Sequence, residues 1–167
     1  MFFAAHRERV RFSIKDNRIK GVCEIEFPNG RKYAQSCVID TGAMRTLVPQ
    51  DVWEPFDRPS FTSGLKRKSA NTAGGKLPVY AVKCTLRLSA EANAGPSGPY
   101  DLGTCDVLLA CDADAVAKEK AQDPNSPREP LKEILLGLGG GALEKGGLCI
   151  NWKEKHAYFI EVDDPPK

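Results

Sequence analysis

The stretch CVIDTGAMRTLVP, residues 37–49, places an aspartate at the end of an apolar run. Asp40 follows two β-branched residues and precedes Thr41 and Gly42. Burying a charged carboxylate is costly unless the group is paired or hydrogen-bonded. A carboxylate that is held in place at a strand end can act as a general acid or base. Asp40 is therefore either an ordinary turn residue or part of a catalytic site.

The residues before and after Asp40 predict the strands that position it. Residues 18–27 and 31–40 both read as strands, and Asn29-Gly30 between them is a strong signal for a two-residue hairpin turn. The second strand of this hairpin would end at Asp40. Residues 43–53 predict a further strand that Pro49 terminates.

The rest of the chain predicts more short strands and little helix. Residues 66–88 indicate two strands around Ala73-Gly74-Gly75, and residues 104–113 indicate another strand. Two loops are expected, one over 54–65 and a Gly- and Pro-rich surface excursion over 89–103. One or two helical turns and a loop are expected over 114–132, followed by an apolar and then glycine-rich stretch over 133–140. The chain should end with a single helical turn over 141–146, a hairpin from 148–152 and 157–162, and a polar tail. Many short strands without a long helical pattern indicate an all-β fold.

The composition suits one folded domain of 167 residues, with 41% hydrophobic and 28% charged residues. A net charge of +2 is too small to imply a nucleic-acid binder by itself, so nucleic acid is not expected as a partner. The charge is uneven, since residues 61–90 hold six bases and no acid, whereas residues 101–133 hold eight acids and four bases. The basic stretch is either a solvated strand face or a means of attracting an acidic segment of a substrate or partner.

The six cysteines are spread singly through the chain without a C-x-x-C pair. They are expected to be reduced, buried residues in a reducing compartment such as the cytoplasm. His6 and His156 lie far apart in the sequence, so no metal site is expected. No signal peptide is visible, and no apolar run approaches the roughly 18 residues that a membrane span needs.

Three motifs, in this order, resemble the retropepsin-like aspartic proteases. VIDTGAMRTLVP resembles their active-site loop, in which an apolar pair precedes Asp-Thr/Ser-Gly-Ala/Ser. NTAGG at 71–75 resembles the tip of the family's flap hairpin, and ILLG at 134–137 resembles the apolar-apolar-Gly signature near its C-terminal end. The resemblance covers residues 18–162, nearly the whole chain.

The resemblance implies a closed, single-lobed β-barrel with one short helix near the C-terminus, built as one domain over residues 1–167. It implies an aspartic endopeptidase that hydrolyses protein or peptide substrates without a metal or an organic cofactor. The resemblance assigns site roles to four groups of residues. These are the catalytic Asp40, the supporting loop residues Thr41, Gly42 and Ala43, the flap residues Thr72, Ala73, Gly74 and Gly75, and the residues behind the loop, Ile134, Leu135, Leu136 and Gly137.

The single Asp-Thr-Gly has a consequence for assembly. Water activation of this kind needs two carboxyls that share one proton, because two carboxyls about 3 Å apart cannot both ionise. Asp112 and Asp114 are not followed by Thr/Ser-Gly, so they are poor candidates for the second group. The second carboxyl is expected from an identical subunit across a two-fold axis, which makes the active protein a homodimer.

Some features depart from the family. Residues 89–103 and 114–132 are insertions relative to retroviral members, and Leu138 and glycines follow ILLG where the family often has a polar residue. Either terminal segment could form the dimer sheet. Two alternatives stay open: a non-catalytic peptide-binding or dimerisation module with the same fold, and an unrelated β-barrel that binds RNA through its basic strand face.

Overall fold

The computed structural model describes residues 6–72, 75–89, 99–137, 139–141, 144 and 146–162. The strands are β1 (His6–Lys15), β2 (Arg18–Glu26), β3 (Lys32–Ile39), β4 (Thr46–Val48), β5 (Lys68–Thr72), β6 (Gly75–Ser89), β7 (Tyr100–Ala110), β8 (Ile134–Leu136), β9 (Gly146–Asn151) and β10 (His156–Val162). Two short α-helices, α1 (Gln50–Trp53) and α2 (Ala113–Gln122), and one 3₁₀ turn, η1 (Glu54–Phe56), accompany them. The all-β prediction is confirmed.

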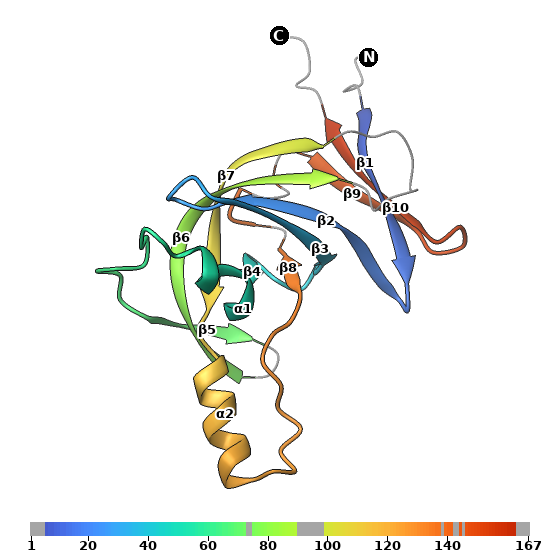
Figure 1. Ribbon diagram of the computed structural model, residues 1–167. Helices are drawn as coiled ribbons and strands as arrows, with labels where there is room; N and C mark the ends of the chain where they lie inside the picture. The colour runs from blue at the N-terminus through green and yellow to red at the C-terminus, as the bar shows by residue number, and fades with distance from the viewer. Residues whose placement is uncertain are drawn as a thin grey trace.

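The strands form one sheet in the order β5-β6-β7-β4-β8-β3-β2-β1-β10-β9. An additional antiparallel pairing joins β2 to β6, which turns the sheet back on itself. Figure 1 shows β1, β9 and β10 gathered at one end of the molecule, whereas α2 projects from the other end. No helix in the described part of the chain is long and apolar enough to cross a membrane.

The hairpin that leads to Asp40 forms as expected, with Glu26 opposite Lys32. Its turn is longer than the predicted two residues, because the Phe27 N–H donates to the Arg31 carbonyl and the Gly30 N–H to the Phe27 carbonyl. Pro28 favours the first corner of such a turn, and Gly30 takes a positive φ of 85°. The two-residue prediction is therefore wrong.

The N-terminal segment was expected only as one of two candidates for the dimer sheet, whereas in the structure β1 pairs with β10 and β2 of the same chain. Val10, Phe12 and Ile14 alternate with polar residues and are buried. The turn into β2 consists of Asp16 and Asn17, whose φ values are 53° and 59°. Two central residues with positive φ are typical of the two-residue turn whose twist matches a hairpin.

Three further segments differ from the expectations. The strand after the Asp-Thr-Gly loop is only Thr46–Val48, and α1 follows because Trp53 buries its ring and donates from Nε1 to the Ala110 carbonyl at 2.8 Å. Helix α2 has ten residues, more than the predicted one or two turns. Strand β7 begins at Tyr100, inside the expected surface excursion, because Leu102 is buried.

Two predictions fall partly outside the described residues. The helical turn expected over 141–146 lies on residues of which only 141, 144 and 146 are described, and these are in turns or at the start of β9. Residues 90–98 of the expected excursion are outside the described part.

The core consists of two apolar clusters. The larger cluster fills the space between β1, β2, β3, β6, β7, β8 and β10, and includes Phe12, Ile25, Leu86 and Phe159. The smaller cluster lies under the β5–β6 hairpin and contains Leu47, Leu77, Val79 and Ala110, with Ala70, Leu108, Leu131 and Leu135 packed against it. The smaller cluster connects the hairpin to the strands that hold Asp40.

Candidate active site

Three short strands place Asp40. Strand β8 runs parallel to the end of β3, with Ile39 opposite Leu136, and antiparallel to β4, with Leu47 opposite Leu135. Strand β8 therefore lies between the two strands that the Asp-Thr-Gly loop connects. The loop must cross over the end of β8, which brings Asp40 to the ends of these strands.

Hydrogen bonds hold the Asp40 loop in shape. The Asp40 N–H donates to the Leu136 carbonyl at 2.9 Å, and the Ala43 N–H donates to the Asp40 carbonyl at 3.1 Å. The Gly42 N–H donates to Asp40 Oδ1 at 2.9 Å. A Cβ at Gly42 would stand 3.3 Å from that oxygen, so glycine suits the position. Within the described part of the chain, Asp40 Oδ2 and the Thr41 hydroxyl have no hydrogen-bond partner.

The glycines after β8 permit close packing against the loop. A Cβ on Gly137 would lie 2.5 Å from the carbonyl carbon and oxygen of Arg45, and one on Gly139 would lie 2.5 Å from the Met44 carbonyl oxygen. The Gly137 N–H donates to the buried Thr46 hydroxyl at 3.3 Å, and the Gly139 N–H donates to the Met44 carbonyl at 2.9 Å. Ile134 and Leu136 lie in the main core beneath the loop.

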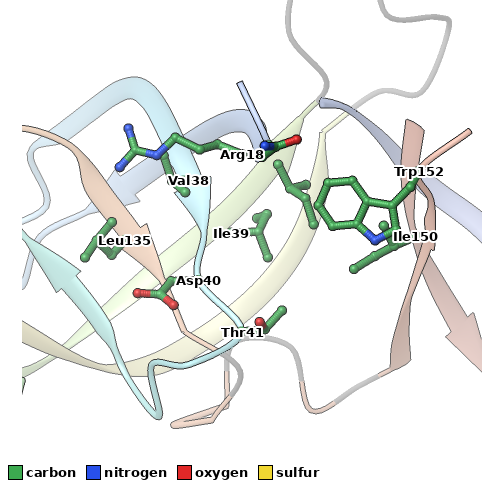
Figure 2. A pocket seen from close by; sticks show the side chains of 10 residues that line it. Arg18, Val38, Ile39, Asp40, Thr41, Leu135, Ile150 and Trp152 are labelled. Carbon is green, nitrogen blue, oxygen red and sulfur yellow. The ribbon is translucent and has the colours of Figure 1, made fainter. Parts of the chain in front are cut away.

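Asp40 opens onto a cavity of about 460 Å³. Figure 2 shows Asp40 and Leu135 on one side of this pocket, with Ile150 and Trp152 of the β9–β10 hairpin on the other side. The lining residues are Asn17, Arg18, Ile19, Val38, Ile39, Asp40, Thr41, Leu135, Ile150 and Trp152. The pocket thus combines one carboxylate with walls that are both polar and apolar.

Asp40 is the one acidic residue among those that line the pocket. Arg18 lies in the same lining, but its guanidinium is bound to Glu133 at 3.0 Å. Asp112 is only 4% exposed and accepts the Leu131 N–H at 3.1 Å, and Asp114 lies in the first turn of α2. Neither of these aspartates lines the pocket, so the described part of one chain offers Asp40 no second carboxyl there.

The β5–β6 hairpin lies next to this site. Its inner residues Ala70 and Leu77 pack with Leu47 and Leu135, and Leu135 also lines the Asp40 pocket. At the tip, the Thr72 hydroxyl donates to the Gly75 carbonyl at 2.7 Å, and Gly75 has a φ of 110°. The predicted tip residues Ala73 and Gly74 lie outside the described residues.

Sequence reasoning missed the far wall of the pocket. Ile150 and Trp152 are 38% and 49% exposed, although large apolar side chains are usually buried. Met44, in the Asp40 loop, is 77% exposed. Trp152 lines the pocket together with Thr41, and this position in the fold is what links it to the site. Trp53 and Phe159, in contrast, are buried in the core.

The cysteines are free thiols in the described structure, and Cys149 differs from the other five because it is exposed. Burial, with a smaller contribution from Cys105, raises the pKa of Cys84 to about 12. Among the described residues, no three His, Cys, Asp or Glu side chains are grouped so that they could hold a metal ion.

Comparisons with protein-family models and with curated proteins found no match to this chain. A solved structure does match: the crystal structure of a retropepsin-like aspartic protease from Rickettsia conorii, with a TM-score of 0.53. The match covers 98% of this chain and 98% of the other chain, at 12% sequence identity. The chain therefore has a fold similar to that of a retropepsin-like aspartic protease.

Proposed function

We propose that this protein is an aspartic endopeptidase that works as a homodimer. The observation that carries the proposal is how the two carboxylate oxygens of Asp40 are bonded. One oxygen of its carboxylate is fixed by the Gly42 N–H, and the other is free to meet a ligand in the pocket. A carboxylate that is fixed on one side and open on the other can take a proton from a bound water molecule.

The reaction needs a second carboxyl, and an identical chain can supply it. In a two-fold dimer the two Asp40 side chains face each other and share one proton. The ionised carboxyl accepts a proton from water as the water attacks the peptide carbonyl. The protonated carboxyl donates a hydrogen bond to the carbonyl oxygen, where negative charge develops.

The surface around Asp40 supports such a dimer. Met44, Ile150 and Trp152 expose apolar surface within or opposite the Asp40 loop. Apolar side chains exposed around a single site indicate a protein–protein interface. In the dimer, the free hydroxyl of Thr41 would hydrogen-bond across the axis and hold the two loops in register.

The β5–β6 hairpin acts as the flap that covers a bound peptide. An extended peptide would lie between this hairpin and the two Asp40 loops and would form main-chain hydrogen bonds with Thr72, Ala73, Gly74 and Gly75. Leu135 contributes to the apolar wall, while Ile134, Leu136 and Gly137 support the loop from behind. The proposal includes a closed barrel of one lobe over residues 1–167, which the β2–β6 pairing supports.

Replacement of Asp40 tests the function. Asp40→Asn preserves the size of the side chain but removes the charge, so we expect no cleavage of a peptide library. Asp101→Asn is a matched control, because Asp101 Oδ1 accepts the N–H of Gly103, two residues later, at 2.8 Å in the same local pattern. Circular dichroism and sedimentation show whether each variant keeps its fold and its dimer.

The alternative function is a non-catalytic peptide-binding or dimerisation module with the same fold. Cleavage that persists in Asp40→Asn excludes the proposed mechanism. If neither the natural protein nor Asp40→Asn cleaves any peptide, but both bind peptides equally, the alternative function is supported instead.

A further inference from the structure

The β5–β6 hairpin carries positive charge that the described protein does not neutralise. Lys66, Arg67, Lys68 and Lys76 are exposed on this hairpin and on the segment that leads into it. None of these four residues forms a salt bridge in the described part of the chain. We call these four residues the flap bases.

The two other bases of β6 form ion pairs, unlike the flap bases. Lys83 and Arg87 lie further along β6, where the strand is part of the main sheet. Lys83 is 3.1 Å from Asp106, and Arg87 is 4.0 Å from Glu24. The positive charge of residues 61–90 is therefore balanced on the main sheet and left open on the hairpin.

Among the flap bases, Arg67 lies near other polar and charged groups. Arg67 lies over the ring of Tyr80, with its Cζ 5.8 Å from the ring centroid, and Asp114 of α2 acts on it electrostatically. No acidic residue occurs between Phe61 and Ala90. Asp114 can offset one of the four positive charges, so the hairpin keeps a net positive field.

Lys68 lies on the face of the hairpin that packs toward the strands around Asp40. Lys68 is opposite Val79, and strand alternation places it on the same face as Ala70, which packs against the smaller core cluster. Leu135, which lines the Asp40 pocket, packs against that same cluster. Lys76 is opposite Asn71 and lies on the other face of the hairpin.

We propose that the flap bases make this protein select acidic peptides, with Asp or Glu side chains on the residues that flank the bond to be cleaved. The proposal rests on the proposed function, because it assigns a substrate class to the same site. Long, exposed lysine side chains can pair with several positions of an extended peptide. The resulting preference is electrostatic, so it weakens as salt screens the charges.

The test compares matched peptides. Peptides from a tryptic digest of denatured proteins are first searched for cleavage sites, and one cleaved sequence is synthesised with two Glu residues or two Gln residues flanking the same bond. We expect kcat/KM to be about threefold to tenfold higher for the Glu peptide at low salt, and the ratio to approach one near 0.5 M NaCl, on the order of magnitude expected for exposed ion pairs.

A charge-reversed hairpin provides the decisive comparison. In the double variant Lys68→Glu and Lys76→Glu, the ratio of kcat/KM for the Glu peptide to that for the Gln peptide should fall below one. The control is the double variant Lys118→Glu and Lys155→Glu, which changes the net charge equally on α2 and on the β9–β10 turn and should keep the natural ratio. If the hairpin variant keeps the kcat/KM ratio of the natural protein, the proposal is overturned.

A binding measurement separates this proposal from the proposed function. Fluorescein-labelled Glu and Gln peptides are titrated into Asp40→Asn, with and without the hairpin reversal. Preferential, salt-sensitive binding of the Glu peptide that the reversal removes supports acidic-peptide selection, even if the natural protein cleaves nothing. Equal binding of both peptides overturns it. Tighter, flap-dependent binding of a labelled oligouridylate also overturns it, in favour of RNA.

Discussion

Gly137→Ala should strongly destabilise the protein. The added Cβ would lie 2.5 Å from the carbonyl carbon and oxygen of Arg45 and 2.8 Å from its nitrogen, whereas ordinary contact begins at 3.4 Å. These are backbone atoms, so no side-chain rotation can relieve the clash. Strand β8 would have to move away from the Asp40 loop by about an ångström, which would break the bond from Gly137 to Thr46 and weaken that from Gly139 to Met44.

The expected loss is about 3 kcal/mol of the free energy of unfolding. Overpacking of a filled site costs about 1–3 kcal/mol, and a lost buried hydrogen bond adds about 1 kcal/mol. The lower entropy of the unfolded Ala variant returns about 0.4–1 kcal/mol. Peptide cleavage should also fall, because the same movement displaces the carbonyl of Leu136 that accepts the Asp40 N–H.

Urea unfolding, followed by tryptophan fluorescence, measures this change. Gly147→Ala is the control, since a Cβ on Gly147 in β9 would meet nothing within 4 Å. It should change the free energy of unfolding by less than about 0.5 kcal/mol. If Gly137→Ala is equally neutral, the close approach of β8 to the Asp40 loop does not exist in solution.

Three more predictions concern the dimer surface, the cysteines and acid stability. Trp152→Ala should weaken dimerisation at least about tenfold in sedimentation experiments, as expected for an aromatic interface anchor, and an unchanged dimer contradicts that role. Cys149 should be the one thiol that reacts rapidly with Ellman's reagent near pH 8, because the other five are buried and burial raises the pKa of Cys84 to about 12. The rapid reaction should be absent in Cys149→Ser, and rapid labelling of several thiols argues against the buried core. Burial raises the pKa of Asp57, but hydrogen bonds from Thr62 and its neighbours outweigh this and lower it. Asp57 therefore stabilises the fold above its unfolded pKa of about 3.9, and this stability is lost as the pH falls through the lower folded value. In Asp57→Asn, the free energy of unfolding in urea should fall less steeply over this acidic range. An unchanged pH dependence contradicts the stabilising role of Asp57.

The elements near Asp40 were predictable because their sequence signals are local. The hairpin before Asp40 has a Pro-Asn-Gly turn, and the β5–β6 hairpin has paired glycines. The same local reasoning could have found β1, whose Val10, Phe12 and Ile14 alternate as a half-buried strand should. The charged residues between them make the segment polar overall, which masks the alternation.

The pocket could not be predicted, because its two walls are far apart in the sequence. Ile150 and Trp152 come from the β9–β10 hairpin, more than a hundred residues after Asp40. The pairing of β10 with β1, and of β1 with β2, places that hairpin beside the Asp40 loop. Pairings between distant strands depend on the whole sheet, and no local pattern encodes them.

The central claim is that two Asp40 side chains from two chains form one site, and a mixing experiment tests it most directly. The natural protein and Asp40→Asn are combined in varied proportions at constant total concentration and left to exchange subunits. If both carboxyls are needed, cleavage follows the square of the natural fraction, so an equal mixture retains about a quarter of the activity. Activity that falls in direct proportion, with about half remaining in the equal mixture, would show that each chain works alone and would contradict the shared site.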